Sequence, residues 1–111
     1  MKRISFKVPT ASGERLEQGY VARLYVGNVK HRFVLQLDGS RPSILADYRS
    51  GYKLANLASL ALAQYVANPY AYDDSLLGWR KRAQRTVDDI VAAKGENRIL
   101  DMLGNVPALN A

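Results

Sequence analysis

Two strand-like segments on either side of Gly27-Asn28 constrain the fold of this chain more than any other feature. Glycine and asparagine both tolerate a positive φ, so this pair favours a two-residue hairpin turn. The turn fixes a register in which Val26 lies opposite Val29 and Leu24 lies opposite His31. Further from the turn, the same register pairs Ala22 with Phe33 and Tyr20 with Leu35. We therefore expect this side of the hairpin to face the core.

A second turn, at Gly39-Ser40, predicts that another strand follows along the sheet. The pairs expected on the core side are Leu35 with Ile44, Phe33 with Ala46 and His31 with Tyr48. The pairs expected on the reverse side are Arg32 with Asp47 and Val34 with Leu45. Charge and hydrophobicity match on both sides, which favours this register.

The amino-terminal segment predicts the first strand of the same sheet. Apolar and polar residues alternate from Lys2 to Val8, as in a strand with one buried face. Proline cannot donate a ladder hydrogen bond, so we expect the strand to end at Pro9. The polar stretch from Pro9 to Gly19 then predicts a long exposed hairpin loop.

The second half of the chain predicts helices packed on one face of a four-stranded antiparallel meander. Tyr52 to Ala67 is apolar on most of its circumference and predicts the central helix on the sheet. A second helix is expected from Leu76 to Lys94 with Gly95 as its cap, and a short third helix from Glu96 to Leu103. The sequence thus predicts one α+β domain over residues 1–111, with the meander in 1–50, a helical part in 51–104, and a tail in 105–111 that either docks or stays mobile.

Composition argues against several classes of function. The chain has no cysteine, which excludes a disulfide scaffold and a thiolate metal site, and a single histidine cannot build the usual zinc sites. We expect His31 to be partly buried and bonded to the Tyr48 hydroxyl, with no nucleophile or carboxylate nearby. The pairs Asp73-Asp74 and Asp88-Asp89 suit a helix terminus and surface ion pairs. A non-enzymatic protein without cofactor or metal is therefore expected.

Hydropathy gives no indication of a membrane protein. The amino terminus alternates polar and apolar residues, unlike a secretory signal. The most apolar stretch, Leu54 to Ala67, is shorter than the roughly 20 residues that a bilayer needs. We expect a cytoplasmic, phage-like protein.

Basic residues are in excess, with 16 lysine and arginine residues against 10 aspartate and glutamate residues and a net charge of +6. This excess favours an anionic partner. One predicted basic surface surrounds Tyr25 on the outer side of the sheet and contains Arg3, Lys7, Arg23, Lys30 and Arg32. The other lies on the second helix and contains Arg80, Lys81, Arg82 and Arg85. A basic sheet with an aromatic side chain suits a single-stranded nucleic acid.

The same outer side carries an apolar stripe of Val21, Val34 and Leu45 in the predicted register. Such a stripe needs a cover, either the carboxy-terminal part of the chain, a second copy in a homodimer, or another protein. Two functions stay open: a nucleic-acid-binding module, or a phage- or plasmid-type accessory protein that inhibits or regulates a host protein through this stripe. The expected order of strands and helix is similar in topology to the Whirly and Pur-type single-stranded nucleic-acid binders, without a shared residue motif.

Overall fold

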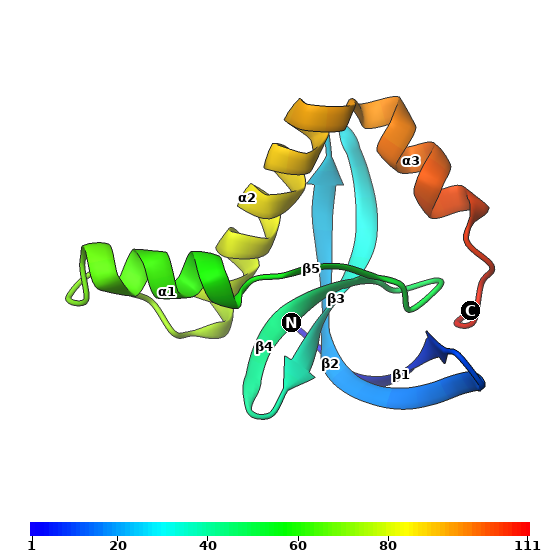
Figure 1. Cartoon of the computed structure of the whole chain (residues 1–111), viewed down its shortest axis with the longest axis horizontal. Helices are drawn as coiled ribbons and strands as arrows, with labels where there is room; N and C mark the ends of the chain where they lie inside the picture. Colours follow the sequence, from blue (N-terminus) through cyan, green and yellow to red (C-terminus); the bar gives the residue numbers. More distant parts are fainter.

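The fold is an antiparallel sheet of five strands in sequential order, followed by three helices (Figure 1). The computed structural model describes all residues from Met1 to Ala111. The strands are β1 (Arg3–Thr10), β2 (Gly13–Val26), β3 (Val29–Asp38), β4 (Arg41–Asp47) and β5 (Lys53–Asn56). The helices are α1 (Ala58–Ala67), α2 (Leu76–Lys94) and α3 (Glu96–Asn105). The predicted α+β class and the meander of the first four strands are confirmed.

The β2–β3 hairpin has the predicted register throughout. Gly27 lies in the turn with a φ of 61°, and Val26 pairs with Val29. The other predicted pairs also form: Leu24 with His31, Ala22 with Phe33, and Tyr20 with Leu35. Most of these side chains belong to the main core, which the sheet forms with α2 and α3 through Trp79, Ala83, Val87, Ile99 and Leu103.

The β3–β4 register differs from the prediction by one residue. Asp38 pairs with Arg41 across the expected turn, but the register then shifts before Gln36 meets Ile44. Two residues of β4, Pro42 and Ser43, thereby oppose the single residue Leu37, which is a β-bulge. Beyond the bulge the pairs are Leu35 with Leu45, Val34 with Ala46 and Phe33 with Asp47. Because a one-residue slip exchanges the two faces of a strand, the predicted pairs on both sides of β4 are wrong.

The predicted length of the hairpin loop from Pro9 to Gly19 is also wrong, because only Ala11 and Ser12 lie between strands β1 and β2. Thr10 pairs with Gly13, and β2 is a 14-residue strand. Pro9 is tolerated because β1 is an edge strand. Two residues earlier, the N–H of Lys7 points out of the sheet toward Asn110, so the nitrogen of Pro9 also faces the free edge and no ladder bond is lost.

The sheet bends so strongly that β1 covers part of its reverse side. Phe6 and Val8 of β1 pack there against Val34 and Ala46 in a second, smaller core. Gly19 lies in β2 against Val34 and the backbone of β3, where a Cβ atom would have no room. A glycine at this position therefore allows the close approach of the two strands.

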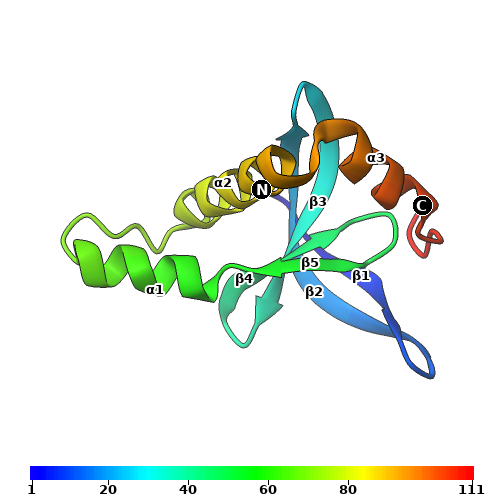
Figure 2. The same cartoon turned by 45° about the horizontal axis from the view of Figure 1, so that its top comes forward.

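The central helix on the sheet is α2, and not the first helix as predicted. Residues Lys53–Asn56 form β5 beside β4, and α1 begins only at Ala58. Ala61 is the one buried residue of α1, and the helix projects from the sheet at the end opposite the β1–β2 hairpin (Figure 2). The predicted bounds of α2 are confirmed, and Gly95 ends it with a φ of 90°. None of the three helices combines the length and the apolar character needed to cross a membrane.

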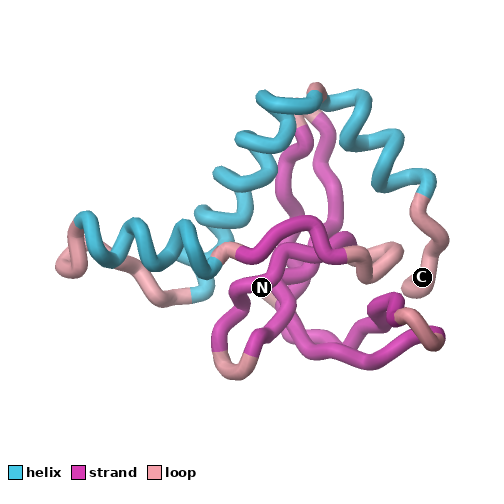
Figure 3. Tube along the Cα trace, in the orientation of Figure 1, coloured by secondary structure: helices cyan, strands magenta, loops and turns pink.

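The carboxy-terminal tail docks on the sheet, which decides between the two predicted alternatives. It begins after α3, which continues through Gly104 to Asn105, and it returns to the end of β1 (Figure 3). The Asn110 side chain accepts from the Lys7 N–H at 2.9 Å and donates to the carbonyl oxygens of Lys7 and Tyr48 at 3.0 and 2.8 Å. Asn110 thus satisfies backbone groups of both β1 and the β4–β5 turn.

Candidate functional site

A concentration of unpaired positive charge lies on the reverse side of the β2–β3 hairpin. Arg23 and Arg32 are opposite each other in the ladder, and Tyr25 is opposite Lys30. All four side chains are exposed. The ion pairs of the structure are Lys7 with Glu14, Arg15 with Glu17, and His31 with Asp47, so none of these cations has an acidic partner within 4.0 Å. Like charges directly opposite each other destabilise a sheet unless an anion neutralises them.

Two hollows at this surface share three lining residues, and we treat them together as one groove. The first is lined by Arg23, Lys30, His31 and Arg32 without a hydrophobic residue. The second shares three of these residues and extends over the β4–β5 turn and the tail; its other lining residues are Tyr48, Arg49, Ala108, Asn110 and Ala111. We define the basic groove as Arg23, Lys30, His31, Arg32, Tyr48 and Arg49.

Aromatic rings accompany the cations of the basic groove. The Arg32 guanidinium lies over the Tyr48 ring at 4.8 Å from its centroid. The Lys30 ammonium lies 5.8 Å from the centroid of Tyr25, whose side chain is about half exposed. Cation–π contacts of this kind hold a long basic side chain in place without neutralising its charge. The groove therefore presents oriented cations next to flat apolar surfaces.

The histidine of the groove is held by a buried carboxylate that the sequence did not predict. His31 Nε2 lies 2.7 Å from Asp47 Oδ1, and the other carboxylate oxygen accepts from the Ser50 N–H and hydroxyl at 3.0 and 2.6 Å. Burial opposes ionisation of Asp47, but the hydrogen bonds from His31 and Ser50 outweigh it and lower the pKa of this carboxyl. The expected bond to Tyr48 is wrong, because the bulge in β4 turns Asp47 to the side of His31.

The His31–Asp47 pair borders the groove from the core side of the hairpin, and it does not supply a nucleophile. The nearest hydroxyl in the network, that of Ser50, is buried and donates to Asp47. His31 itself is partly exposed beside Lys30 and Arg32.

Two of the five residues predicted around Tyr25 lie on the other side of the sheet. Cross-strand partners share a face, and Arg3 pairs with Tyr20 while Lys7 pairs with Leu16. Lys7 also forms an ion pair with Glu14 at 3.3 Å. The predicted gathering of Arg3 and Lys7 with the hairpin cations is wrong, because the β1 residues in phase with Arg23 are the apolar Ile4, Phe6 and Val8.

The basic residues of α2 divide among three environments. Arg80 donates to the carbonyl oxygen of Arg23 at 3.1 Å and so extends the positive charge beyond the basic groove. Lys81 and Arg85 line a separate hollow near the end of α1, together with Asp73. The four residues of α2 that were predicted to form a basic surface therefore do not lie on one surface.

Arg82 is part of the core, so its predicted role in contacting nucleic acid is wrong. Only 3% of the residue is exposed. Its guanidinium lies between the rings of Tyr72 and Trp79, 4.5 Å from each centroid. It donates to Gln64 at 2.8 Å and to the Asp73 carbonyl oxygen at 2.5 Å. Arg82 therefore fastens α1 and the α1–α2 connection to α2.

The predicted apolar stripe on the outer side of the sheet does not exist as an exposed surface. Val34 is fully buried beneath β1, in the smaller core. Leu45 is fully buried in the main core, on the opposite side of the sheet. Val21 alone is partly exposed. A protein partner or a second copy has no continuous stripe to contact here.

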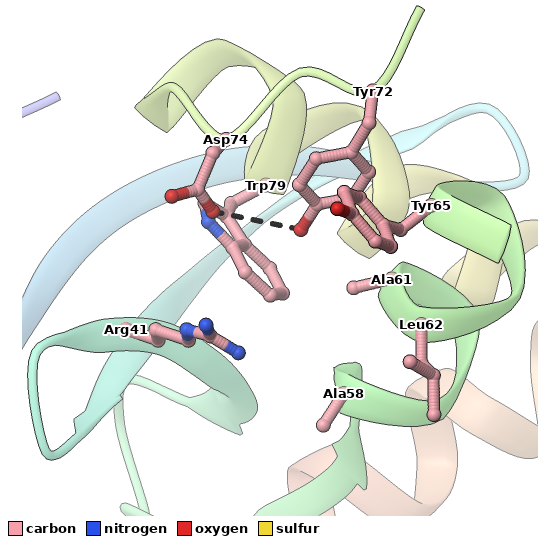
Figure 4. Close-up of a pocket in the computed structure, with 8 residues that line it drawn as sticks. All are labelled: Arg41, Ala58, Ala61, Leu62, Tyr65, Tyr72, Asp74 and Trp79. Carbon is pink, nitrogen blue, oxygen red and sulfur yellow. Dashed lines mark hydrogen bonds between the residues drawn. The ribbon is translucent and has the colours of Figure 1, made fainter. Parts of the chain in front are cut away.

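An apolar cleft that the sequence analysis missed lies beside α1 (Figure 4). Its lining residues are Arg41, Ala58, Ala61, Leu62, Tyr65, Tyr72, Asp74 and Trp79. The Tyr65 and Tyr72 rings meet edge to face at 5.6 Å between centroids, and the Tyr72 hydroxyl lies 3.5 Å from Asp74. The strongly apolar composition of this segment predicted burial, and so gave no indication of a cleft.

Nowhere in the structure do three histidine, cysteine, aspartate or glutamate side chains gather as a metal ion would require. Comparison with protein-family models, with curated proteins and with solved structures finds no match to this chain. The feature with the clearest chemistry is the basic groove, whose exposed cations attract anions.

Proposed function

We propose that this protein is a non-enzymatic module that binds nucleic acid, preferably single-stranded, through the basic groove. The observation that carries the proposal is the exposed pair Arg23 and Arg32, directly opposite in the ladder and without an acidic partner. Such a pair is destabilising in the free protein and favourable beside an anion. A phosphate backbone supplies anions in a row, which suits a groove with cations along its length.

The groove also favours single strands over duplexes. Tyr25 and Tyr48 place aromatic rings next to Lys30 and Arg32. Single-strand binders combine a positively charged path for the backbone with rings on which bases stack, and bases are free to stack only where the strand is unpaired. The proposal implies a cytoplasmic location, where such a partner is available.

The test is fluorescence anisotropy of labelled single-stranded and double-stranded DNA over a salt series. Log affinity is expected to fall linearly with log salt, with a slope of about 0.7 for each phosphate contact on a single strand. Replacing both Arg23 and Arg32 with glutamine should weaken binding by about tenfold or more in 0.1 M salt, and reduce the slope by about 1.4.

A matched control uses the other exposed cations of α2. The double substitution of Lys81 and Arg85 with glutamine removes the same charge from the separate hollow near α1. It should leave the slope within about 0.3 of the wild-type value. An equal loss of DNA affinity in both double variants would show that binding depends only on net charge, and this would refute a defined groove.

The alternative function is that of an accessory protein that acts on a host protein. The apolar sheet stripe that was predicted to bind the host protein is not exposed. The exposed apolar residues gather on α1 instead, at Leu62, Tyr65 and Val66. If neither DNA binds at physiological salt, this helix becomes the main contact surface of the protein.

A further inference from the structure

Helix α1 is apolar on most of its circumference, and yet only Ala61 of the helix is buried in the core. The chain has no charged residue from Leu54 to Tyr72. Leu62 and Val66 are nevertheless 64% and 72% exposed, and the helix projects away from the sheet (Figure 1). A helix that is hydrophobic on all sides is normally buried, and an exposed apolar patch marks a site of interaction.

The helix is nevertheless held in place along one side. Gln64 accepts a hydrogen bond from Arg82, and the Tyr65 ring packs against Tyr72. These contacts fix the direction in which α1 leaves the body. The outward residues Leu62 and Val66 are therefore presented on a rigid support, and this lowers the entropic cost of binding a partner.

Charge identifies the partner that fits this surface. With a net charge of +6, two copies of the chain repel each other over most of their surfaces. The uncharged segment from Leu54 to Tyr72 is where two copies can approach without that repulsion. A twofold contact brings the same patch of both copies together, so a patch without charge is compatible with itself.

The charged residues at the rim of the neighbouring cleft can also pair between two copies of the chain. Arg41 and Asp74 line the cleft and form no ion pair with each other (Figure 4). Across a twofold axis, Arg41 can meet Asp74 of the partner subunit, and the reciprocal pair then forms as well. Small side chains at Ser59 and Ala63 on α1 allow two helices to approach closely.

We propose that α1 is a self-association surface, through which two copies of this chain form a dimer by packing their α1 helices together. Leu62, Tyr65 and Val66 supply the apolar contact. The proposal does not rest on the basic groove, because it uses a different part of the molecule. A nucleic acid does not fit α1, because the helix has no cation to contact a phosphate.

The test is light scattering after size-exclusion chromatography, with the full chain over a range of concentrations. The wild-type protein should elute as a dimer with twice the chain mass of 12.3 kDa. Leu62→Glu should elute as a folded monomer, with its dissociation constant raised roughly 100-fold or more by two unpaired carboxylates in the contact. Leu16→Glu is the matched control, because Leu16 is 67% exposed in the β1–β2 hairpin at the other end of the molecule; it should stay dimeric.

A second measurement does not depend on elution. The melting temperature of a dimer rises with protein concentration, whereas that of a monomer does not. The rise should be present in wild type and Leu16→Glu and absent in Leu62→Glu. The proposal would be overturned if the wild-type protein is still a monomer at a protein concentration of about 100 μM, or if the Leu62→Glu variant is still a dimer.

Discussion

Replacing Asp47 with asparagine tests the buried network that orients His31. The carboxylate accepts three hydrogen bonds, one from His31 and two from Ser50. Asparagine has one acceptor oxygen in place of two, so it loses at least one of these bonds and turns an N–H₂ group toward a donor. Hydrogen bonds to a charged group contribute about 1.5–3 kcal/mol each, and we expect a loss of about 2–3 kcal/mol at pH 7.

The assay is urea unfolding followed by circular dichroism. With a slope of about 1.5 kcal/mol per molar urea, the midpoint should fall by about 1.3–2 M. The control Asp101→Asn removes an exposed carboxylate of α3 and should stay within about 0.5 kcal/mol of wild type.

The loss of stability in Asp47→Asn should be larger at neutral pH than at acidic pH. The folded-state pKa of Asp47 is lowered, so its ionised form stabilises the fold above the ordinary carboxyl range. This contribution is lost as the pH falls through the folded pKa, which lies below 3.8. The difference between wild type and Asp47→Asn should therefore be full at pH 7 and shrink at pH 3. A difference below about 0.5 kcal/mol at pH 7, or one that does not change with pH, would refute the reasoning.

Two further substitutions test the bend of the sheet and the docking of the tail. Gly19→Ala should destabilise the protein by about 1–3 kcal/mol in urea unfolding, because a Cβ atom there meets Val34 and the β3 backbone. Gly104→Ala, with open space around it in α3, should be neutral or stabilising by up to about 1 kcal/mol; equal effects would contradict the packing. Asn110→Ala removes three hydrogen bonds to Lys7 and Tyr48 and should speed hydrogen exchange of the Lys7 amide at least tenfold, and unchanged exchange would show that the tail does not dock.

The β2–β3 hairpin was predictable because turn chemistry and alternation agree over its whole length. The turn at Gly27-Asn28 sets the register, and no irregularity follows it. The bounds of α2 were predictable for a similar reason. Ser75 caps its first turn by accepting from the Gly78 N–H, and Gly95 ends it. In both elements, local residues alone determine the conformation.

The β4 register was not predictable from alternation, because the expected register matches residues of like character, whereas the observed one pairs Phe33 with Asp47 and Gln36 with Ile44. Pro42, next to the turn, was the one local hint of a bulge. The error has a large consequence because it exchanges faces: Leu45 enters the main core, and Asp47 reaches His31 and not Arg32.

The environments of α1 and Arg82 were mispredicted because residue type alone does not determine burial. An apolar helix can be exposed, and a basic side chain can be buried. The apolar segment ending at Ala67 was assigned to the core, and basic Arg82 to the surface. In the structure α1 projects outward, and Arg82 lies between Tyr72 and Trp79. In contrast, the opposition of Arg23 and Arg32 followed directly from the correct hairpin register.

The most direct test of the proposed nucleic-acid site is a nuclear magnetic resonance titration of the ¹⁵N-labelled protein with a short oligothymidylate. Our account predicts amide shifts concentrated at Arg23, Lys30, Arg32 and Arg49, with little change in α1. Shifts confined to α1, or no shifts at physiological salt, would contradict binding in the basic groove.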